Sequence, residues 1–586
     1  MNNFGERNIM RRHSYLGFCL ENEKGLTLIS VFFRILSALM PTGKIWILAW
    51  FLNSLKDMDH IMTSFIILIG YFLLEYFLNQ VVSYVGVHLN TRISVAYDIH
   101  LTEKKSRILY AQLENYQVRN LIDRVSEDCS GKMQEGLWNR LDVWEYIIRI
   151  GGIVFTILYT SIYVGIVVAV LFLVLIPIIK KCGEDDYLAY EQASEQFRKA
   201  KYLSTLFTKS ENVDERKVFH SSKWLNQKWE SWYQKGRIFS KNATQKNFLK
   251  IKAGSMMTVA AGMIIATAML WPVKKGSMSV GLYISTITGV WSLIQLMGWK
   301  VALILEDFIS NRLYLKDYID FINLKEEKVS SLIGHRTINT IEFRQVRFHY
   351  PECEKEILAG INFTLYNGKT YALVGENGSG KSTIVKLLLG LYDDYEGSIL
   401  LDGRELREIS KEERIRLCSC AFQDFAHYEV SVKDNILLGE ELINEETMME
   451  EVLAQLGMLE RIKQLPNELH TVLGRLEKDA VNLSGGEWQR IAIARSLIRH
   501  STIQIMDEPT ASLDPIHEKE IYDLLIDKMK QGIGIFITHR LGGVRNADQI
   551  LVLKEGIIKE QGTFEELTTK PGMFRRMYEL QKGWYV

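Results

Sequence analysis

The run from Gly375 to Thr383 combines glycines, a lysine and two hydroxyl side chains in an order that suits a phosphate chain. It matches the pattern G-x-x-x-x-G-K-[ST] and follows the apolar stretch 370–374. Backbone N–H groups of such a turn, and the N-terminus of a helix after it, can surround phosphates. A turn that only reverses the chain would need neither Lys381 nor Ser382. The run therefore predicts a site for ATP or GTP, with these contacts: Gly375, Glu376, Asn377, Gly378, Ser379, Gly380, Lys381, Ser382 and Thr383.

Two adjacent carboxylates, Asp507 and Glu508, end a second apolar stretch, 503–506. A fold tolerates such a pair at the end of a buried strand where a cation or a reaction uses it. Asp507 suits coordination of Mg²⁺, to which Ser382 would also bind, and Glu508 suits polarising the water that attacks the γ-phosphate. Taken alone, the pair could also be the acidic first turn of a helix.

A third turn, Ser484-Gly485-Gly486-Glu487, precedes the helix-like stretch 488–499. A serine and two glycines at a helix start leave N–H groups free to meet an anion. Ser484 and Glu487 also fit a capping box, in which each side chain bonds the other's backbone. The two readings are compatible, because the geometry that caps a helix can also bind phosphate.

The elements that position these residues change character along the chain of 586 residues. The first half contains six apolar stretches long enough for a bilayer, which needs about 20 residues each. Polar stretches with helical periodicity, 88–142 and 180–248, separate the second from the third and the fourth from the fifth; we expect them to be cytosolic extensions of the spans. The six stretches are 26–52, 61–87, 143–159, 163–179, 249–271 and 280–305.

Basic residues in the N-terminus and in both long connections place these parts in the cytosol by the positive-inside rule, although Lys274 and Lys275 count against it. An even number of spans then puts the C-terminal part on the same side. We therefore expect a multi-pass protein of the cell membrane. The formal net charge of zero gives no indication of a nucleic-acid partner.

From Ile341 onward, short strands, glycine turns and helices alternate, as in an α/β nucleotide-binding domain. The expected fold is an all-α transmembrane domain of six helices followed by an α/β P-loop domain. We expect the transmembrane domain at 1–320, a polar linker at 321–340 and the nucleotide-binding domain at 341–586.

Together these motifs resemble those of an ATP-binding cassette (ABC) exporter half-transporter over nearly the whole chain. In that family the serine-glycine-glycine turn, called the signature, completes the ATP site of the opposite subunit. The resemblance implies that Ser484 and Gly486 contact a phosphate held by a partner's Gly378–Thr383. Because the chain has one copy of each motif, it implies a dimer with a second half-transporter, either identical or different.

Further positions match the family one by one. Tyr350 resembles the aromatic residue that stacks on adenine, and Gln423 resembles the glutamine that touches Mg²⁺ and the attacking water. Ser512 and Asp514 resemble the loop that joins the two sites, called the D-loop, and His539 resembles the switch histidine that bonds the γ-phosphate. One departure is Glu487, where glutamine is more usual; it adds a negative charge beside a phosphate-binding turn.

The resemblance implies ATP-driven export by alternating access, with cytosolic turns near 115–121 and 214–219 pressing into grooves near Gln423. The run Gly486–Arg490 resembles bacterial exporters of modified peptides, so a peptide is the expected cargo; amphiphilic drugs or lipids are the alternative. A membrane-anchored P-loop ATPase with a regulatory role is the rival from another class, and six paired spans disfavour it. Glu75 lies within a span and needs water or a partner.

Overall fold

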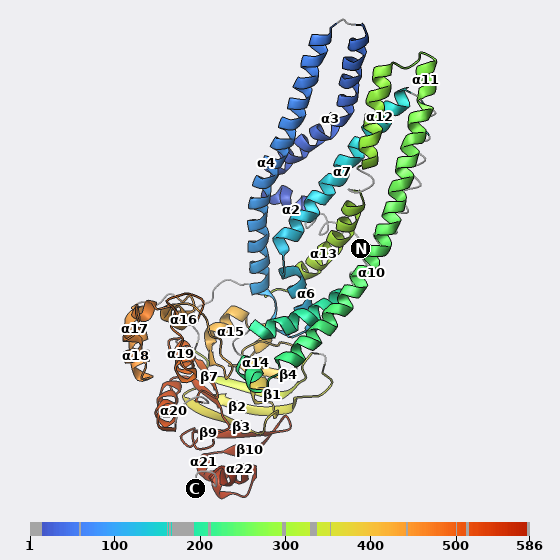
Figure 1. Cartoon of the computed structure of the whole chain (residues 1–586). Helices are drawn as coiled ribbons and strands as arrows, with labels where there is room; N and C mark the ends of the chain where they lie inside the picture. The colour runs from blue at the N-terminus through green and yellow to red at the C-terminus, as the bar shows by residue number, and fades with distance from the viewer. Residues whose placement is uncertain are drawn as a thin grey trace. The chain divides into compact units, whose positions relative to one another are not determined.

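The computed structural model forms two compact units (Figure 1). Unit 1 comprises residues 1–106 and 117–324, and unit 2 comprises residues 107–116 and 325–586. The structure describes residues 15–57, 60–160, 162, 166, 193–208, 213–295, 301–327, 337–351, 353–440, 444–499, 501–510 and 515–582. The fourth expected span, 163–179, therefore lies almost wholly outside the described residues.

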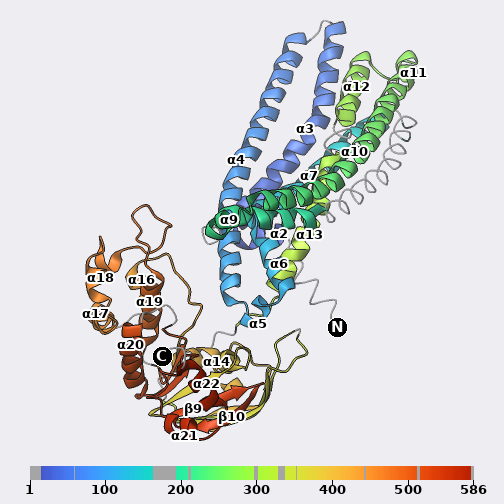
Figure 2. The ribbon, with the colours of Figure 1, turned by 60° about the horizontal axis from the view of Figure 1, so that its bottom comes forward.

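All the regular elements in the described residues of unit 1 are helices. Its helices are α2 (Tyr15–Asn22), α3 (Lys24–Asp57), α4 (Ile61–Arg107), α6 (Tyr116–Ser126), α7 (Cys129–Thr160), α9 (Val213–Val218), α10 (Ser222–Ala268), α11 (Leu270–Lys274), α12 (Val280–Gln295) and α13 (Val301–Ile322), and residues 193–208 are helical too. In both views α3 and α4 run side by side (Figure 2).

Two helices of unit 1, α4 and α10, have 47 residues each. At about 1.5 Å per residue each is about 70 Å long, more than twice the bilayer's hydrocarbon core of about 30 Å. In the described part of the chain, two helices are long and apolar enough to cross a membrane, 24–55 and 61–107. Residues 88–107 and 222–248 of the long polar connections are thus continuations of apolar helices.

The apolar ends of four helices meet in one core in unit 1. Ile45 of α3, Ile153 of α7, Ile265 of α10 and Val290 of α12 belong to one buried cluster. Other apolar side chains of α3 and α4, such as Phe32 and Phe77, are largely exposed. Apolar surface of this kind suits lipid rather than water.

Glu75, the carboxylate predicted to need a partner, lies beside Lys44 at 3.4 Å. A second polar contact joins the same helices, because Ser37 Oγ donates to Asn79 Oδ1 at 2.8 Å. Charged groups inside spans pair in this way because desolvating a lone charge is costly. Polar contacts therefore join α3 to α4.

Unit 2 is built from two sheets. The first has the order β2-β1-β4-β5 and is antiparallel; the second has the order β10-β9-β3-β8-β7-β6 and is parallel except for β10. The strands are β1 (Thr340–Phe348), β2 (Leu358–Tyr366), β3 (Lys369–Gly375), β4 (Glu396–Leu401), β5 (Arg404–Glu405), β6 (Cys418–Ala421), β7 (Ile503–Asp507), β8 (Ile533–Ile537), β9 (Gln549–Lys554) and β10 (Ile557–Gly562).

The described residues of unit 2 also form helices. They are α5 (Tyr110–Leu113), α14 (Lys381–Leu388), α15 (Lys411–Leu417), α16 (Val432–Leu437), α17 (Glu445–Gln455), α18 (Leu459–Lys463), α19 (Gly485–Leu497), α20 (Pro515–Met529), α21 (Phe564–Thr569) and α22 (Met573–Lys582). The predicted fold class, helical first and α/β second, is confirmed.

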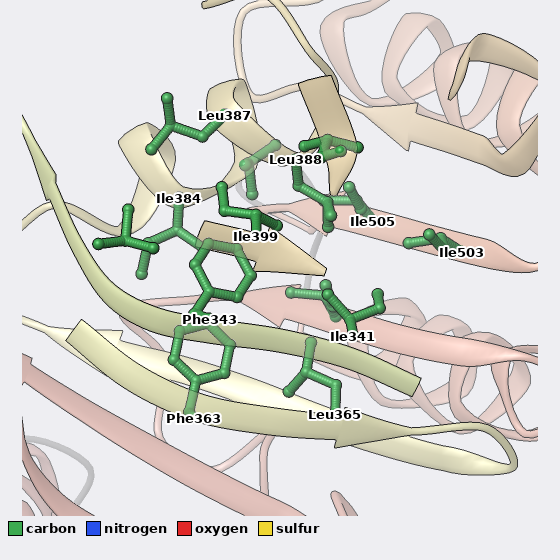
Figure 3. Close-up of a cluster of buried hydrophobic side chains, with 14 of the residues drawn as sticks. Ile341, Phe343, Phe363, Leu365, Ile384, Leu387, Leu388, Ile399, Ile503 and Ile505 are labelled. Atoms are coloured by element: carbon green, nitrogen blue, oxygen red, sulfur yellow. The ribbon is translucent and has the colours of Figure 1, made fainter. Parts of the chain in front are cut away.

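One buried cluster joins both sheets to α14 (Figure 3). Phe343 of β1 stacks on Phe363 of β2, with ring centroids 4.3 Å apart. Ile384 of α14 and Ile505 of β7 lie in the same cluster. The helix that follows the phosphate loop is therefore fixed against the strand that ends in Asp507.

Candidate nucleotide site

The phosphate loop joins β3 to α14 as the sequence predicts, and glycine is required at both of its ends. A Cβ on Gly375 would lie 2.3 Å from the carbonyl oxygen of Leu553 on β9. Gly380 caps α14 with a φ of +107°, which side chains rarely tolerate. The close approach and the left-handed turn aim the start of α14 at the inside of the loop.

Lys381 is 5% exposed and lies folded back onto its own loop. Its Nζ donates to the carbonyl oxygens of Gly375 at 2.9 Å and Glu376 at 3.0 Å. Burial lowers the pKa of Lys381, and the charges of Glu508 and Asp507 offset part of that effect. The ammonium is therefore desolvated and positioned before any phosphate arrives.

Ser379 supplies the clearest sign that the loop fits a phosphate. Its side chain is buried, yet its Oγ has no hydrogen-bond partner among the described residues. A buried hydroxyl without a partner costs about 1–3 kcal/mol. A phosphate oxygen within the loop would supply the missing acceptor, so the residues fit ATP.

The carboxylate pair stands at the carboxyl end of β7, as predicted. Asp507 is 8% exposed, and burial raises its pKa to about 6, with Glu508 and Asp424 contributing and Lys381 opposing. A buried carboxylate with a raised pKa is suited to a cation ligand. Ser382, the other predicted Mg²⁺ ligand, is exposed at the start of α14.

Glu508 has a left-handed backbone, with a φ of +48°. Its N–H donates to the carbonyl oxygen of Ile537 at 2.9 Å, and its own carbonyl accepts from Nε2 of Gln489 at 3.1 Å. Strained conformations of this kind persist at functional sites where neighbours fix them. Gln489 was not predicted, and a polar residue within a helix gives no signal of such a role.

His539 lies beside Glu508, with Nε2 of the imidazole 3.1 Å from Oε1 of the carboxylate. Burial and the charge of Lys381 lower the pKa of His539, while Glu508 opposes them. The imidazole is therefore mostly neutral at pH 7, so one ring nitrogen can donate to the carboxylate. The structure thus brings together the predicted base and the predicted switch histidine.

The signature turn forms both halves of a capping box at the start of α19. Ser484 Oγ accepts from the Glu487 N–H at 3.3 Å, and Glu487 Oε2 accepts from the Ser484 N–H at 2.7 Å. Ser484 and Gly485 are exposed and Gly486 is half-buried. Free N–H groups at this helix end can meet an anion from outside the chain.

Arg461 of α18 neutralises the unusual carboxylate of the signature. Its Nε donates to Glu487 Oε1 at 2.9 Å. Burial opposes ionisation of Glu487, but hydrogen bonds from Ser484 and Arg461 outweigh it and lower its pKa. The negative charge expected beside the phosphate-binding turn is therefore paired, and Arg461 is a functional candidate that the motif did not reveal.

Of the remaining predicted residues, the structure describes Tyr350 and Gln423. The Tyr350 hydroxyl is 3.0 Å from Thr383 Oγ1, which ties the predicted adenine contact to the phosphate loop. Gln423 is exposed in the loop after β6. Ser512 and Asp514 lie outside the described residues, so their predicted role in joining two sites stays a prediction.

Comparisons with known proteins agree with this geometry. The family model described as "ABC transporter" matches residues 358–511. The subtilin transport ATP-binding protein SpaT of Bacillus subtilis is 29% identical over 95% of this chain and 92% of its own length. The nisin transport ATP-binding protein NisT of Lactococcus lactis subsp. lactis is 27% identical over 96% of this chain and 95% of its own.

The fold is also similar to that of a known ABC exporter. A solved structure of a bacterial Atm1-family ABC exporter with ATP bound superposes with a TM-score of 0.81, covering 94% of this chain and 98% of that one, at 19% identity. The chain is an ABC exporter half-transporter. The exporter binds ATP through its cassette and hydrolyses it to drive transport.

A buried Asp507 without a cation should reduce the stability of the exporter at high pH. Its pKa of about 6 in the fold, against an ordinary value of 3.8, means that stability falls as pH rises through this window. Asp507→Asn should therefore stabilise the nucleotide-free protein by about 1–3 kcal/mol at pH 8 and by about half as much at pH 5. Thermal unfolding in EDTA measures the difference.

The matched control is Asp527→Asn, which changes an aspartate with an 80% exposed side chain. That variant should shift stability by less than about 0.5 kcal/mol at either pH. A destabilised Asp507→Asn at pH 8 would show that the carboxylate is already compensated in the free exporter.

Removing Arg461 should expose the charge of Glu487 to the phosphate-binding turn. An unpaired charge there costs about 1 kcal/mol in a partly solvated site, so Arg461→Met should raise the KM for ATP about fivefold. The double variant Arg461→Met/Glu487→Gln should return the KM to within about twofold of the parent. Steady-state ATPase kinetics of the purified exporter measure both.

Arg499→Met provides a control, because Arg499 pairs with Glu440 at 2.8 Å, an ion pair that includes no signature residue. This variant should leave the KM unchanged. If the double variant is as impaired as Arg461→Met alone, Arg461 acts by some route other than neutralising Glu487.

Proposed function

We propose that the exporter moves a peptide out of the cell across the cytoplasmic membrane, as a dimer with two composite ATP sites. The single observation that carries the peptide assignment is similarity over almost the full length, including the helical half, to transport proteins of subtilin and nisin, which are peptide bacteriocins. Similarity confined to the cassette would indicate only ATP hydrolysis, because transporters of different cargoes have similar cassettes.

Within each site, we assign the roles from the contacts around Glu508. Glu508 accepts the proton of the attacking water, and His539 orients that carboxylate and reaches the γ-phosphate. Lys381 leaves the carbonyl oxygens of its own loop for the β- and γ-phosphates. Ser382, Gln423 and Asp507 would hold Mg²⁺, which neutralises charge on the phosphates.

The second half of each site comes from a partner subunit. The exposed N-terminus of α19 presents Ser484 and Gly485 to another chain, and Arg461 removes the charge that would repel a phosphate. Binding of ATP between two subunits favours the closed state, and hydrolysis releases it. The partner is an identical chain or a second half-transporter.

We place the N-terminus and unit 2 in the cytosol, where ATP is available. The basic N-terminus and long connections support this orientation. About half of α4 and half of α10 must extend beyond the bilayer on that side in this orientation.

Replacing the base should stop turnover and leave ATP bound. General-base catalysis contributes about 10²–10⁴-fold, so Glu508→Gln should lower the ATPase rate at least about a hundredfold. Phosphate release and retention of labelled ATP measure the two effects. The control is Glu555→Gln, since Glu555 also has a left-handed backbone, with a φ of +50°, but lies in the turn between β9 and β10. If Glu508→Gln hydrolyses ATP at a rate within twofold of the parent, the catalytic assignment is wrong.

Transport should be specific for a peptide. In inside-out vesicles, fluorescently labelled nisin should accumulate with ATP in vesicles of the parent exporter and not in vesicles of Glu508→Gln. A cationic dye and a fluorescent phospholipid, tested in the same vesicles, should show no ATP-dependent movement. Movement of dye or lipid without any movement of peptide would assign the exporter to the alternative cargo class.

A further inference from the structure

A short segment of the helical half belongs by its contacts to the nucleotide unit. Residues 107–116, between α4 and α6, group with unit 2, although the helices on both sides belong mainly to unit 1. There Ile108 pairs with Glu326 in an antiparallel bridge, and the Glu327 N–H donates to the carbonyl oxygen of Arg107 at 2.8 Å. We call residues 107–109 and 325–327 the connector ribbon.

The connector ribbon contains two points where the chain passes between the units. Because its two strands are hydrogen-bonded, a displacement of either is shared by the other. Lys411, the first residue of α15, forms an ion pair with Glu327 and fixes one edge of the ribbon. On the other side of the ribbon, residues 107–109 lead directly into α5, and Glu114 follows that helix.

Glu114 is the centre of a polar cluster directly after α5. Its Oε1 accepts from the Tyr110 hydroxyl at 2.9 Å and from Nζ of Lys386 at 3.2 Å. Its Oε2 accepts from the Tyr392 hydroxyl. Lys386 is on α14, the helix that begins at the phosphate loop, so one carboxylate joins the segment to that helix.

Lys386 in turn contacts Tyr350, the residue assigned to adenine. Its Nζ lies 5.3 Å from the ring centroid of Tyr350, 5.6 Å from that of Tyr110 and 6.0 Å from that of Tyr392. The rings of Tyr350 and Tyr392 meet edge to face at 5.5 Å. The ring of Tyr350 is thus in contact with two groups that Glu114 binds, Lys386 and Tyr392.

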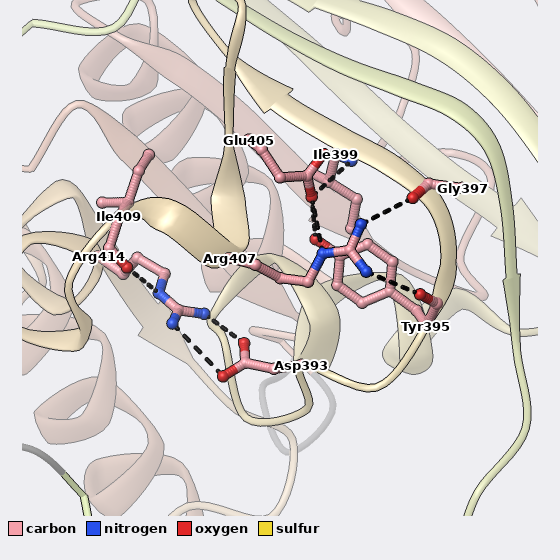
Figure 4. Close-up of polar contacts among 8 residues, drawn as sticks. All are labelled: Asp393, Tyr395, Gly397, Ile399, Glu405, Arg407, Ile409 and Arg414. Atoms are coloured by element: carbon pink, nitrogen blue, oxygen red, sulfur yellow. Dashed lines mark hydrogen bonds and ion pairs between the residues drawn. The ribbon is translucent and has the colours of Figure 1, made fainter.

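The loop that carries Tyr392 is itself fixed (Figure 4). Arg414 donates to Asp393 Oδ1 at 2.6 Å, and Arg407 donates to the carbonyl oxygens of Tyr395 at 3.1 Å and Gly397 at 2.9 Å. Tyr392 therefore cannot follow a displaced Glu114 easily. A movement of the segment is expected to reach Tyr350 through Lys386 and the tyrosine hydroxyls.

We propose that Glu114 is a positioning residue that sets the ring of Tyr350 for the adenine base and so links occupation of the ATP site to the connector ribbon. The proposal rests on the assignment of Tyr350 as the base contact. It predicts that the identity of the base matters: a purine that stacks well on the ring should gain from Glu114, and a pyrimidine that stacks less should gain little.

The test uses the full-length exporter in lipid nanodiscs. Displacement of a fluorescent ATP analogue in Mg²⁺-free buffer gives the Kd for ATP and for UTP without turnover. Loss of a charge-assisted hydrogen bond should make Glu114→Gln bind ATP about fivefold more weakly. Its affinity for UTP should change less than twofold, and in a Tyr350→Leu background the substitution should have no further effect on ATP.

Lys411→Met is the matched control, because it removes the ion pair with Glu327 at the other edge of the ribbon. In the described part of the chain, Lys411 has no hydrogen bond or ring contact with the tyrosine cluster. It should affect ATP and UTP equally. If Glu114→Gln does not assemble, Lys386→Met serves in its place. It should likewise weaken the binding of ATP more than the binding of UTP.

Equal losses for ATP and UTP, or additive effects of Glu114→Gln and Tyr350→Leu, would overturn the proposal and leave Glu114 as a docking contact only. A Tyr350→Leu exporter that binds ATP as the parent does would instead refute the base assignment on which the proposal rests. Neither outcome depends on catalysis by Glu508. The proposal for Glu114 can therefore fail while the proposed ATP-driven function stands.

Discussion

Two carboxylates and one ammonium share a desolvated space at the carboxyl ends of β3 and β7, and the cassette is built around that constraint. Asp507 is buried with a raised pKa, Lys381 is buried with a lowered pKa, and Glu508 is held in a left-handed conformation beside His539. None of these states is favourable in isolation. They are tolerated because ATP and a cation would complete the charges, so stability is given up where function requires it.

The signature turn also contains an unfavourable charge, but there the chain itself compensates it. There the unfavourable charge, Glu487, is compensated within the chain by Arg461 and by the capping box. The turn has no left-handed residue and no buried polar side-chain atom without a partner, and Ser484 and Gly485 are exposed. One side of the composite site is therefore prepared for a ligand inside the fold, and the other for a ligand presented by a second chain.

The motifs were predictable because each depends on residues that are adjacent in the sequence. Gly375–Thr383, the pair Asp507-Glu508 and the turn Ser484–Glu487 all occur on the elements expected for them. The contacts that tune them were not predictable. Gln489 reaches Glu508 from α19, Arg461 reaches Glu487 from α18, and Glu114 reaches Lys386 across 272 positions.

The sequence by itself determined the chemistry of the site and the division into an apolar helical half and an α/β half, because both are written in local pattern and composition. Only the tertiary structure decided that residues 107–116 group with unit 2 and that Glu75 pairs with Lys44. It also decided that the charge of Glu487 is paired with Arg461. The physical reason is the same in each case. Hydrogen bonds and ion pairs between distant positions leave no periodicity in the sequence, since only the folded chain brings their two halves within reach.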